Sequence, residues 1–196
     1  MNLLYRFDTE AFRAIHVGLY RDWLDPVMVV ITDSGRGEVK FTLLFALCFV
    51  SRTRPYALMA LVAGVSSGLF GQLVKGLIER DRPSNFSWAE PLTSYIEVLS
   101  GQTAPAAANS FPSGHAVSSF AIAVALAWAM RKTEHAWIGW VVIVWATLVA
   151  FSRVYVGVHF LSDVIGGAAI GTMFGTVCYM LWKRRGWLAE PSHAEH

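Results

Sequence analysis

The sequence predicts an all-α fold, an integral membrane helical bundle. Of its 196 residues, 55% are hydrophobic and only 15% are charged, whereas charged residues make up about a quarter of a soluble domain. Several apolar segments approach the roughly 20 residues that a helix needs to cross a hydrocarbon core. We therefore expect a single membrane-embedded domain over 1–196, with interfacial helices at 1–36, a transmembrane core at 37–182 and a cytoplasmic tail at 183–196.

Two short helices are expected before the spans. Residues 4–20 separate apolar from charged side chains, which is typical of a helix lying in the membrane interface. The apolar stripe consists of Leu4, Phe7, Ala11, Ile15 and Leu19. Asp25 and Pro26 are typical of a helix start, with Asp25 as the cap, and this second helix should end near Ser34 and Gly35. Only about ten of its residues are apolar, too few to cross.

Five segments are predicted to span the membrane, or six if the N-terminal segment also crosses. Residues 55–74, 112–130, 135–152 and 164–182 contain no Asp, Glu, Lys or Arg. The segment 39–51 is shorter and has Lys40 near one end, where its side chain can extend to the interface. The N-terminus lacks the uninterrupted apolar run of a cleavable signal.

Two predicted spans carry small residues four apart, a spacing that allows close approach of helix backbones in lipid. These residues are Ala60, Gly64 and Gly68 in one span and Gly167, Gly171 and Gly175 in the other. We interpret both rows as packing seams.

Basic residues between the spans indicate the orientation of the bundle. The clusters are Arg52 with Arg54, Arg131 with Lys132, and Lys183 with Arg184 and Arg185. An even number of crossings separates them, so they share one side of the membrane, and the positive-inside rule makes that side cytoplasmic. The opposite ends of the spans then face outward.

Three groups of polar residues lie at these outward ends. In KGLIERDRP, Lys75 and Arg82 are seven residues apart and share one helical face if the helix continues to the proline. PSGH begins another span, with Ser113 in the position of a helix cap. In SRVYVGVHFLSD, His159 and Asp163 are at i and i+4 and can touch. Each group alone also fits a structural role, but their coincidence on one face indicates a site.

The residue types in these groups are those that bind a phosphate. Phosphoryl transfer needs positive charge around the phosphate oxygens, and arginine has a planar fork that matches them. A helix N-terminus adds free amides, and glycine lets the backbone approach closely. The predicted phosphate-binding residues are Lys75, Arg82, Ser113, Gly114 and Arg153.

Two histidines can then divide the chemistry. A histidine that is oriented by a carboxylate can attack phosphorus and form a phosphohistidine, while a second histidine protonates the departing oxygen. Asp163 lies one turn from His159 and makes it the nucleophile, which leaves His115 as the general acid. Neither a metal nor another cofactor is expected, because one His–Asp pair supplies too few ligands.

These motifs resemble a known family. Lys75-x6-Arg82-Pro83, Pro112-Ser113-Gly114-His115 and Ser152-Arg153-x5-His159-x3-Asp163 are similar in order and spacing to the three signature motifs of the type-2 phosphatidic-acid phosphatase superfamily, which also includes the vanadium haloperoxidases. The resemblance covers residues from about 75 to 163, without substitution at a signature position. It implies a helical bundle, metal-free hydrolysis and the residue roles given above. At the N-terminus the sequence departs from the six-span bacterial members, whose first transmembrane helix we expect to be missing here.

The leading interpretation is a lipid phosphatase of the bacterial inner (cytoplasmic) membrane, with its active site facing the periplasm or outside. Short family members include undecaprenyl-pyrophosphate phosphatases, so the resemblance favours undecaprenyl pyrophosphate as the substrate. Phosphatidylglycerophosphate, phosphatidic acid and a lipid A phosphate are the alternatives, because the motifs recognise the phosphate and not the tail. We expect the 84–110 loop and the lipid-facing grooves to select among them.

A non-hydrolytic anion or lipid transporter is the alternative of another class. Transport would require polar residues along the depth of several spans, whereas here the ionisable residues gather at one end. The expected partners are the lipid phosphate substrate and the bilayer. A nucleic acid is not expected, because the net charge is only +2 and the basic residues are sorted by membrane side.

Overall fold

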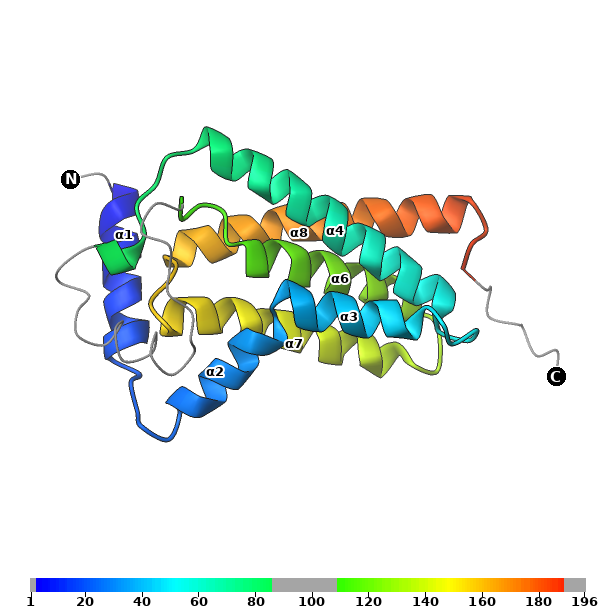
Figure 1. The fold of residues 1–196 in the computed structure, drawn as a ribbon, viewed down its shortest axis with the longest axis horizontal. Helices are drawn as coiled ribbons and strands as arrows, with labels where there is room; N and C mark the ends of the chain where they lie inside the picture. The colour runs from blue at the N-terminus through cyan, green and yellow to red at the C-terminus, as the bar shows by residue number, and fades with distance from the viewer. Residues whose placement is uncertain (1–2, 86–108, 189–196) are drawn as a thin grey trace.

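In the computed structural model, which describes residues 3–85 and 109–188, all regular secondary structure among those residues is helical. The longer helices run side by side as a bundle in Figure 1, and a shorter helix lies beside them. The bundle helices are α4 (Arg54–Leu77), α6 (Gly114–Met130), α7 (Ala136–Tyr155) and α8 (Leu161–Arg184), with α3 (Gly37–Leu47) at their side. Two further helices, α1 (Leu3–Phe12) and α2 (Asp25–Ser34), lie at one end. The predicted all-α class is confirmed.

Three helices are long and apolar enough to cross a membrane, namely α4, α7 and α8. Helix α6 is also apolar but has 17 residues. Helix α3 has 11 residues, which at 1.5 Å per residue is about half the thickness of a hydrocarbon core. The protein is a membrane protein, and the count of five spans stays a prediction.

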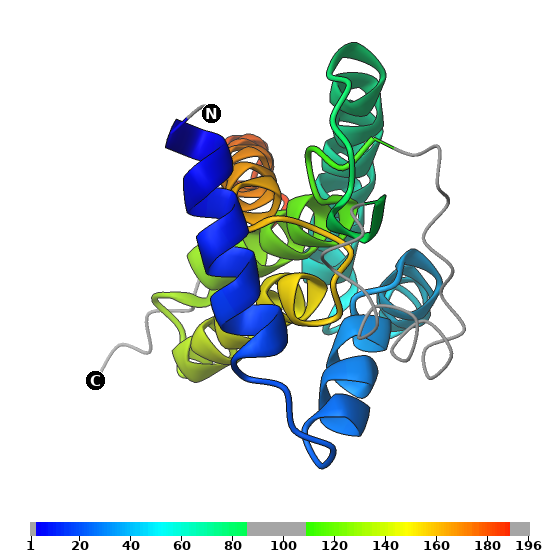
Figure 2. The ribbon, with the colours of Figure 1, turned by 90° about the vertical axis from the view of Figure 1, so that its left-hand side faces the viewer.

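The N-terminal helices cover the end of the bundle. Helix α1 continues into a π-helical turn at Arg13–Val17, and Figures 1 and 2 show α1 lying across the bundle end. Asp8, Phe12 and His16, four residues apart, are all buried against the bundle, while Leu4 on the predicted apolar stripe is 53% exposed. This arrangement fits a helix that lies in the interface with its apolar side chains toward lipid.

Helix α2 has the predicted bounds, but its start differs in detail. Asp25 was expected to cap the helix, but Leu24 holds the N-cap position and Asp25 is the first helical residue. Instead Asp25 is buried and its Oδ1 accepts a hydrogen bond of 2.6 Å from the Tyr155 hydroxyl at the end of α7. The carboxylate therefore connects α2 to α7, because buried polar groups in folded proteins are hydrogen-bonded.

The basic clusters lie together at the far end of the bundle, as predicted. Arg52 and Lys132, from the loops after α3 and α6, line one shared hollow. The end of α8, which carries Lys183 and Arg184, lies at the same end of the bundle in Figure 1. That this end faces the cytoplasm stays a prediction.

The seam on α8 is confirmed as a packing seam against α6. A Cβ atom placed on Gly167 would lie 2.8 Å from the carbonyl oxygen of Ser113. Cβ atoms on Gly171 and Gly175 would likewise strike the α6 backbone, at the carbonyl oxygens of Val117 and Ala121. Only glycine allows the two backbones to come this close.

The seam on α4 is confirmed in part. Ala60 is fully buried, and a Cβ on Gly64 would lie 2.8 Å from the Phe41 ring and 2.9 Å from Ile122. The prediction is wrong for Gly68, since a Cβ there would meet no atom within 4 Å. Gly68 therefore borders open space instead of a neighbouring helix.

Lys40 also departs from expectation. Its side chain was predicted to extend toward the interface, but the residue is 5% exposed. Its Nζ donates hydrogen bonds to the hydroxyl groups of Ser118 and Ser119, at 2.5 and 3.3 Å. Lys40 therefore points inward to α6, because these hydroxyls offer buried acceptors that a hydropathy profile does not reveal.

Candidate active site

The three sequence motifs meet at the end of the bundle opposite the basic loops, where α4 and α7 end and α6 and α8 begin (Figure 1). The Ser113 amide donates to the Asp163 carbonyl oxygen at 3.1 Å, which joins the second motif to the third. The Arg82 guanidinium donates to the Val158 carbonyl oxygen, also at 3.1 Å, which joins the first motif to the third.

Arg82 reaches this position by a route that differs from the predicted one. The helix was expected to continue to the proline, but α4 ends at Leu77 and Ile78 has extended backbone angles (φ −118°, ψ 107°). Arg82 therefore lies in the following loop, just before a short 3-10 turn at Pro83–Asn85. It is nevertheless only 8% exposed, because the loop turns back over the bundle end.

Three cationic side chains converge here. Lys75 donates to the Asn109 carbonyl oxygen at 2.8 Å, and Arg153, which is 5% exposed, donates to the Thr32 hydroxyl at 2.6 Å. Lys75 lies close enough to Arg82 and Arg153 to be repelled by both. Burial lowers the pKa of Arg82, and the Asp163 carboxylate opposes that shift. Such a concentration of positive charge is suited to an anion.

The PSGH segment presents two polar atoms toward this charge. Ser113 precedes α6 with extended backbone (φ −68°, ψ 112°), but its side chain makes no cap hydrogen bond. Ser113 Oγ and His115 Nε2 are both buried, and neither has a hydrogen-bond partner among the residues that the structure describes. Buried polar atoms are nearly always satisfied in folded proteins, so these two indicate the place of a ligand.

His159 and Asp163 come together as predicted, but not on one helical face, because α8 begins at Leu161 and His159 lies in the segment before it. His159 Nδ1 lies 3.6 Å from Asp163 Oδ2, too long for a direct hydrogen bond. Burial lowers the pKa of His159 to about 3; Asp163 opposes this shift, whereas Arg153 and Arg82 add to it. The imidazole is therefore neutral at physiological pH. Because its Nδ1 faces the carboxylate, Nε2 is the nitrogen left for chemistry.

Ser110 completes this pair and was missed in the sequence. Its hydroxyl donates to Asp163 Oδ2 at 2.5 Å and lies 3.4 Å from His159 Nδ1, so it bridges the two side chains. The same Asp163 oxygen accepts the Phe160 amide at 2.8 Å, which fixes the carboxylate in the first turn of α8. Ser110 lies two residues before the PSGH motif, and that proximity was the only available signal.

Arg80 and Asp8 were also missed. Arg80 donates to Asp163 Oδ1 at 2.6 Å and to the Ser162 hydroxyl at 2.7 Å, and it pairs on its other side with Asp8 from α1. Asp8 also accepts the amide and the hydroxyl of Ser162, at 3.0 and 2.7 Å. The first helix is thereby connected to the carboxylate that faces His159.

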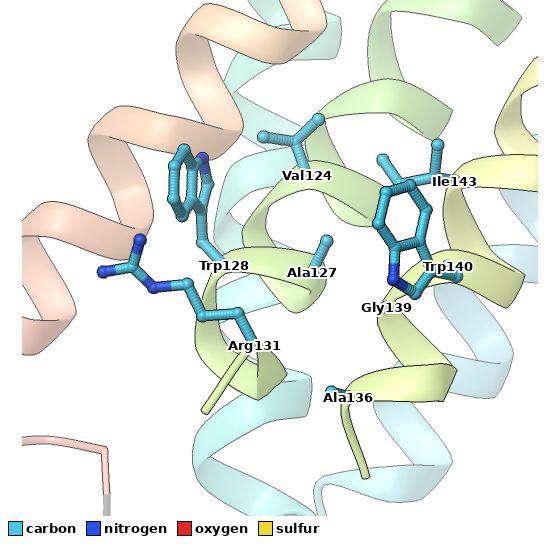
Figure 3. Close-up of a pocket in the computed structure, with 8 residues that line it drawn as sticks. All are labelled: Val124, Ala127, Trp128, Arg131, Ala136, Gly139, Trp140 and Ile143. Carbon is cyan, nitrogen blue, oxygen red and sulfur yellow. The ribbon is translucent and has the colours of Figure 1, made fainter. Parts of the chain in front are cut away.

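Another cavity lies away from these motifs, between α6 and α7 near the basic end (Figure 3). It measures about 490 Å³ and is lined mainly by apolar and aromatic side chains, among them Trp128 and Trp140. Arg131 is its charged residue and lies 4.6 Å from the Trp128 ring. Tryptophan and arginine at a helix end are typical interface anchors, and the lining has no nucleophile.

Comparison with known proteins identifies the family of the chain. The sequence profile of the PAP2 superfamily matches residues 55–187, so the chain belongs to that superfamily, and the resemblance noted in the sequence is confirmed. The chain is a membrane phosphatase of this family.

Particular relatives are also similar over most of their length. The undecaprenyl-diphosphatase BcrC of Bacillus subtilis is 29% identical over 85% of this chain and 79% of its own. Phosphatidylglycerophosphatase B of the same organism is 31% identical over 84% and 78%. The crystal structure of a transmembrane PAP2-type phosphatidylglycerolphosphate phosphatase from Bacillus subtilis superimposes with a TM-score of 0.74 at 26% identity, covering 94% of this chain and 88% of that one.

Proposed function

We propose that this phosphatase removes the terminal phosphate of a lipid pyrophosphate, with undecaprenyl pyrophosphate as the preferred substrate, at the outer face of a bacterial inner membrane. One observation carries the proposal: three cations converge at the bundle end that holds Ser113 Oγ and His115 Nε2, two buried polar atoms without a hydrogen-bond partner among the described residues, beside a neutral histidine that faces a carboxylate. This set of donors suits a tetrahedral oxyanion.

The reaction proceeds in two balanced steps. His159 Nε2 attacks the terminal phosphorus, so that an N–P bond forms while the bond to the bridging oxygen breaks and His115 gives that oxygen a proton. Water then attacks the phosphohistidine, the N–P bond breaks, and His115 takes up a proton from the water. Ser110, which donates to Asp163, contacts Nδ1 of His159 and keeps the ring oriented toward the carboxylate.

The phosphate oxygens are held by the remaining site residues. Lys75, Arg82 and Arg153 supply the positive charge that offsets the charge of the transferring group. Ser113 Oγ and the free amides at the start of α6, including that of Gly114, supply neutral donors. All of these groups belong to the protein, and no step requires a metal ion.

The test is phosphate release by the purified protein in detergent with EDTA. Undecaprenyl pyrophosphate, phosphatidylglycerophosphate, phosphatidic acid and a lipid A phosphate are offered in parallel. We expect hydrolysis that survives chelation and is fastest with the pyrophosphate. His159→Ala should lower turnover by several orders of magnitude. His135→Ala, which changes an exposed histidine at the other end, should leave it unchanged.

The covalent intermediate provides an independent check. Protein quenched during turnover of a terminally labelled substrate should carry phosphate that survives alkali and is lost in acid, as for phosphohistidine. Label that persists in His159→Ala, or activity abolished by EDTA, contradicts the mechanism. Equal or faster turnover of phosphatidic acid contradicts the substrate.

A further inference from the structure

Lys40 is a buried cation that is not among the proposed phosphate-binding residues. Its Nζ donates to two hydroxyl groups of α6, Ser118 at 2.5 Å and Ser119 at 3.3 Å, and lies 5.6 Å from the centre of the Phe41 ring. Within the described part of the chain, no carboxylate forms an ion pair with it, and the charged group that acts on it most strongly is another cation, Arg153. A buried ammonium without a counter-charge is destabilising, so this position is suited to an anionic ligand.

Lys40 lines a cavity that begins at the proposed general acid. The cavity measures about 340 Å³ and lies between α3, α4 and α6. Lys40, Gly114, His115 and Ser118 are among its lining residues, and Gln72 of α4 lies across from them. The polar part of the cavity is therefore the part next to the catalytic motifs.

The other part of this cavity is apolar. Its lining continues along α4 through Leu69 and Gly68 to Val65 and Gly64, with Phe41 of α3 opposite. Leu69 is 68% exposed, and Gly68 has no neighbour within 4 Å of a Cβ position, so this wall is open to the side of the bundle. An anion-binding end followed by an open apolar groove matches a lipid whose headgroup carries phosphate.

The position of His115 tells which part of the substrate enters this cavity. A general acid touches the departing oxygen, so the group behind that oxygen lies on the His115 side of the transferring phosphorus. For a pyrophosphate that group is a lipid monophosphate, which bears negative charge directly next to the departing oxygen. For a lipid monophosphate it is a neutral alcohol.

We propose that Lys40 binds the internal phosphate of a lipid pyrophosphate, and that the groove along Gly68 receives the first part of the tail. This inference rests on the proposed function and refines it, because it assigns the preference for pyrophosphates to one side chain. Lys40 is a specificity-determining residue here, and monophosphates gain little from it.

The experiment compares two substrates with the same tail, farnesyl pyrophosphate and farnesyl monophosphate. Lys40→Met should lower kcat/KM for the pyrophosphate about 10- to 100-fold, the range expected when a buried hydrogen bond to a charged group is lost, and change it less than about threefold for the monophosphate. Lys183→Met, which removes a lysine at the opposite end, should alter neither value.

Two further variants separate charge from shape. Lys40→Gln removes the charge while keeping a donor for the two serines, and it should show the same selective loss. Gly68→Leu fills the groove without touching the phosphates, and it should lower kcat/KM for both substrates by similar factors. A ratio of the two kcat/KM values that is unchanged in Lys40→Met and Lys40→Gln overturns the inference.

The unmodified protein gives a measurement that does not depend on the folding of variants. A farnesyl methylenediphosphonate, which cannot be hydrolysed, should inhibit at least about tenfold more strongly than farnesyl phosphonate. Equal inhibition overturns the assignment of Lys40. If the unmodified protein cleaves neither farnesyl nor undecaprenyl pyrophosphate but cleaves another lipid phosphate, the proposed function itself is wrong, which is a different outcome.

Discussion

Arg80 provides the sharpest test of how the site is held together. Its guanidinium lies between two carboxylates with no exposed surface, Asp8 of α1 and Asp163 of α8. Arg80→Met keeps an unbranched side chain that can still pack on the Phe160 ring, whose centre lies 4.9 Å from the guanidinium carbon. The substitution therefore removes the charge and the hydrogen bonds while preserving most of the contact with the ring.

The magnitude follows from the bonds that are lost. Hydrogen bonds to charged groups contribute about 1.5–3 kcal/mol each, and Arg80 makes two of them, to Asp8 and Asp163. Because the Arg80 side chain is 21% exposed, solvent screening places the total near the lower end, about 3 kcal/mol in the free energy of unfolding. Asp163 would then face Asp8 without a cation between them. Its shift away from His159 should lower kcat about 10- to 100-fold, as loss of a supporting partner commonly does.

The assay is thermal unfolding in detergent together with steady-state hydrolysis. The double variant Asp8→Asn with Arg80→Met relieves the repulsion between the carboxylates, so it should recover part of both losses relative to Arg80→Met alone. Unchanged unfolding temperature and kcat within about threefold of the unmodified protein in Arg80→Met would refute the reasoning. A double variant less stable than Arg80→Met would also refute it.

Further predictions concern pH, helix packing and the N-terminal cover. The pKa of His159 is about 3 in the folded chain against 6.5 when unfolded. Between these two pH values the unfolded state therefore binds more protons than the folded state. The free energy of unfolding, measured by thermal unfolding, should fall by on the order of 1 kcal/mol per pH unit as the pH drops below about 6.5. Gly171→Leu should destabilise by more than about 3 kcal/mol through overpacking against α6, while Gly76→Leu, at a position with no neighbour within 4 Å, should unfold within about 1 kcal/mol of the original. Tyr155→Phe leaves buried Asp25 without its 2.6 Å donor and should cost about 1–3 kcal/mol. A flat pH profile, a stable Gly171→Leu protein or an unaffected Tyr155→Phe protein would contradict the corresponding contact.

The sequence predicted those features that depend on local spacing. Apolar runs identified the long helices, and Asp25, Pro26 and Ser34 bounded α2 correctly. The i, i+4 relation of His159 and Asp163 brought their side chains together. In each case, the relevant residues lie close together in the sequence, so short-range geometry is enough to bring them together, although His159 lies just before α8 and not on it.

Features that depend on distant partners were not predictable. Arg80 and Asp8 are 72 residues apart, and Lys40 and Ser118 are 78 apart. Lys40 is one charge at the end of an apolar run, a pattern that usually indicates an interface anchor. Only the packing of α3 near α6 gives it buried acceptors. The predicted helical position of Arg82 was wrong for a similar reason. The conformation of the loop after Leu77 depends on the residues against which it packs and not on helical periodicity.

The glycine row on α8 has a consequence for how this protein can change. It locks α6 and α8, and with them His115 and Asp163, into a single rigid unit. The wall formed by α3 and α4 packs against this pair without belonging to the glycine row, and it carries Lys40 and Gly68. Exchange of side chains on that wall can therefore redirect the protein to a different headgroup while the reacting machinery keeps its alignment.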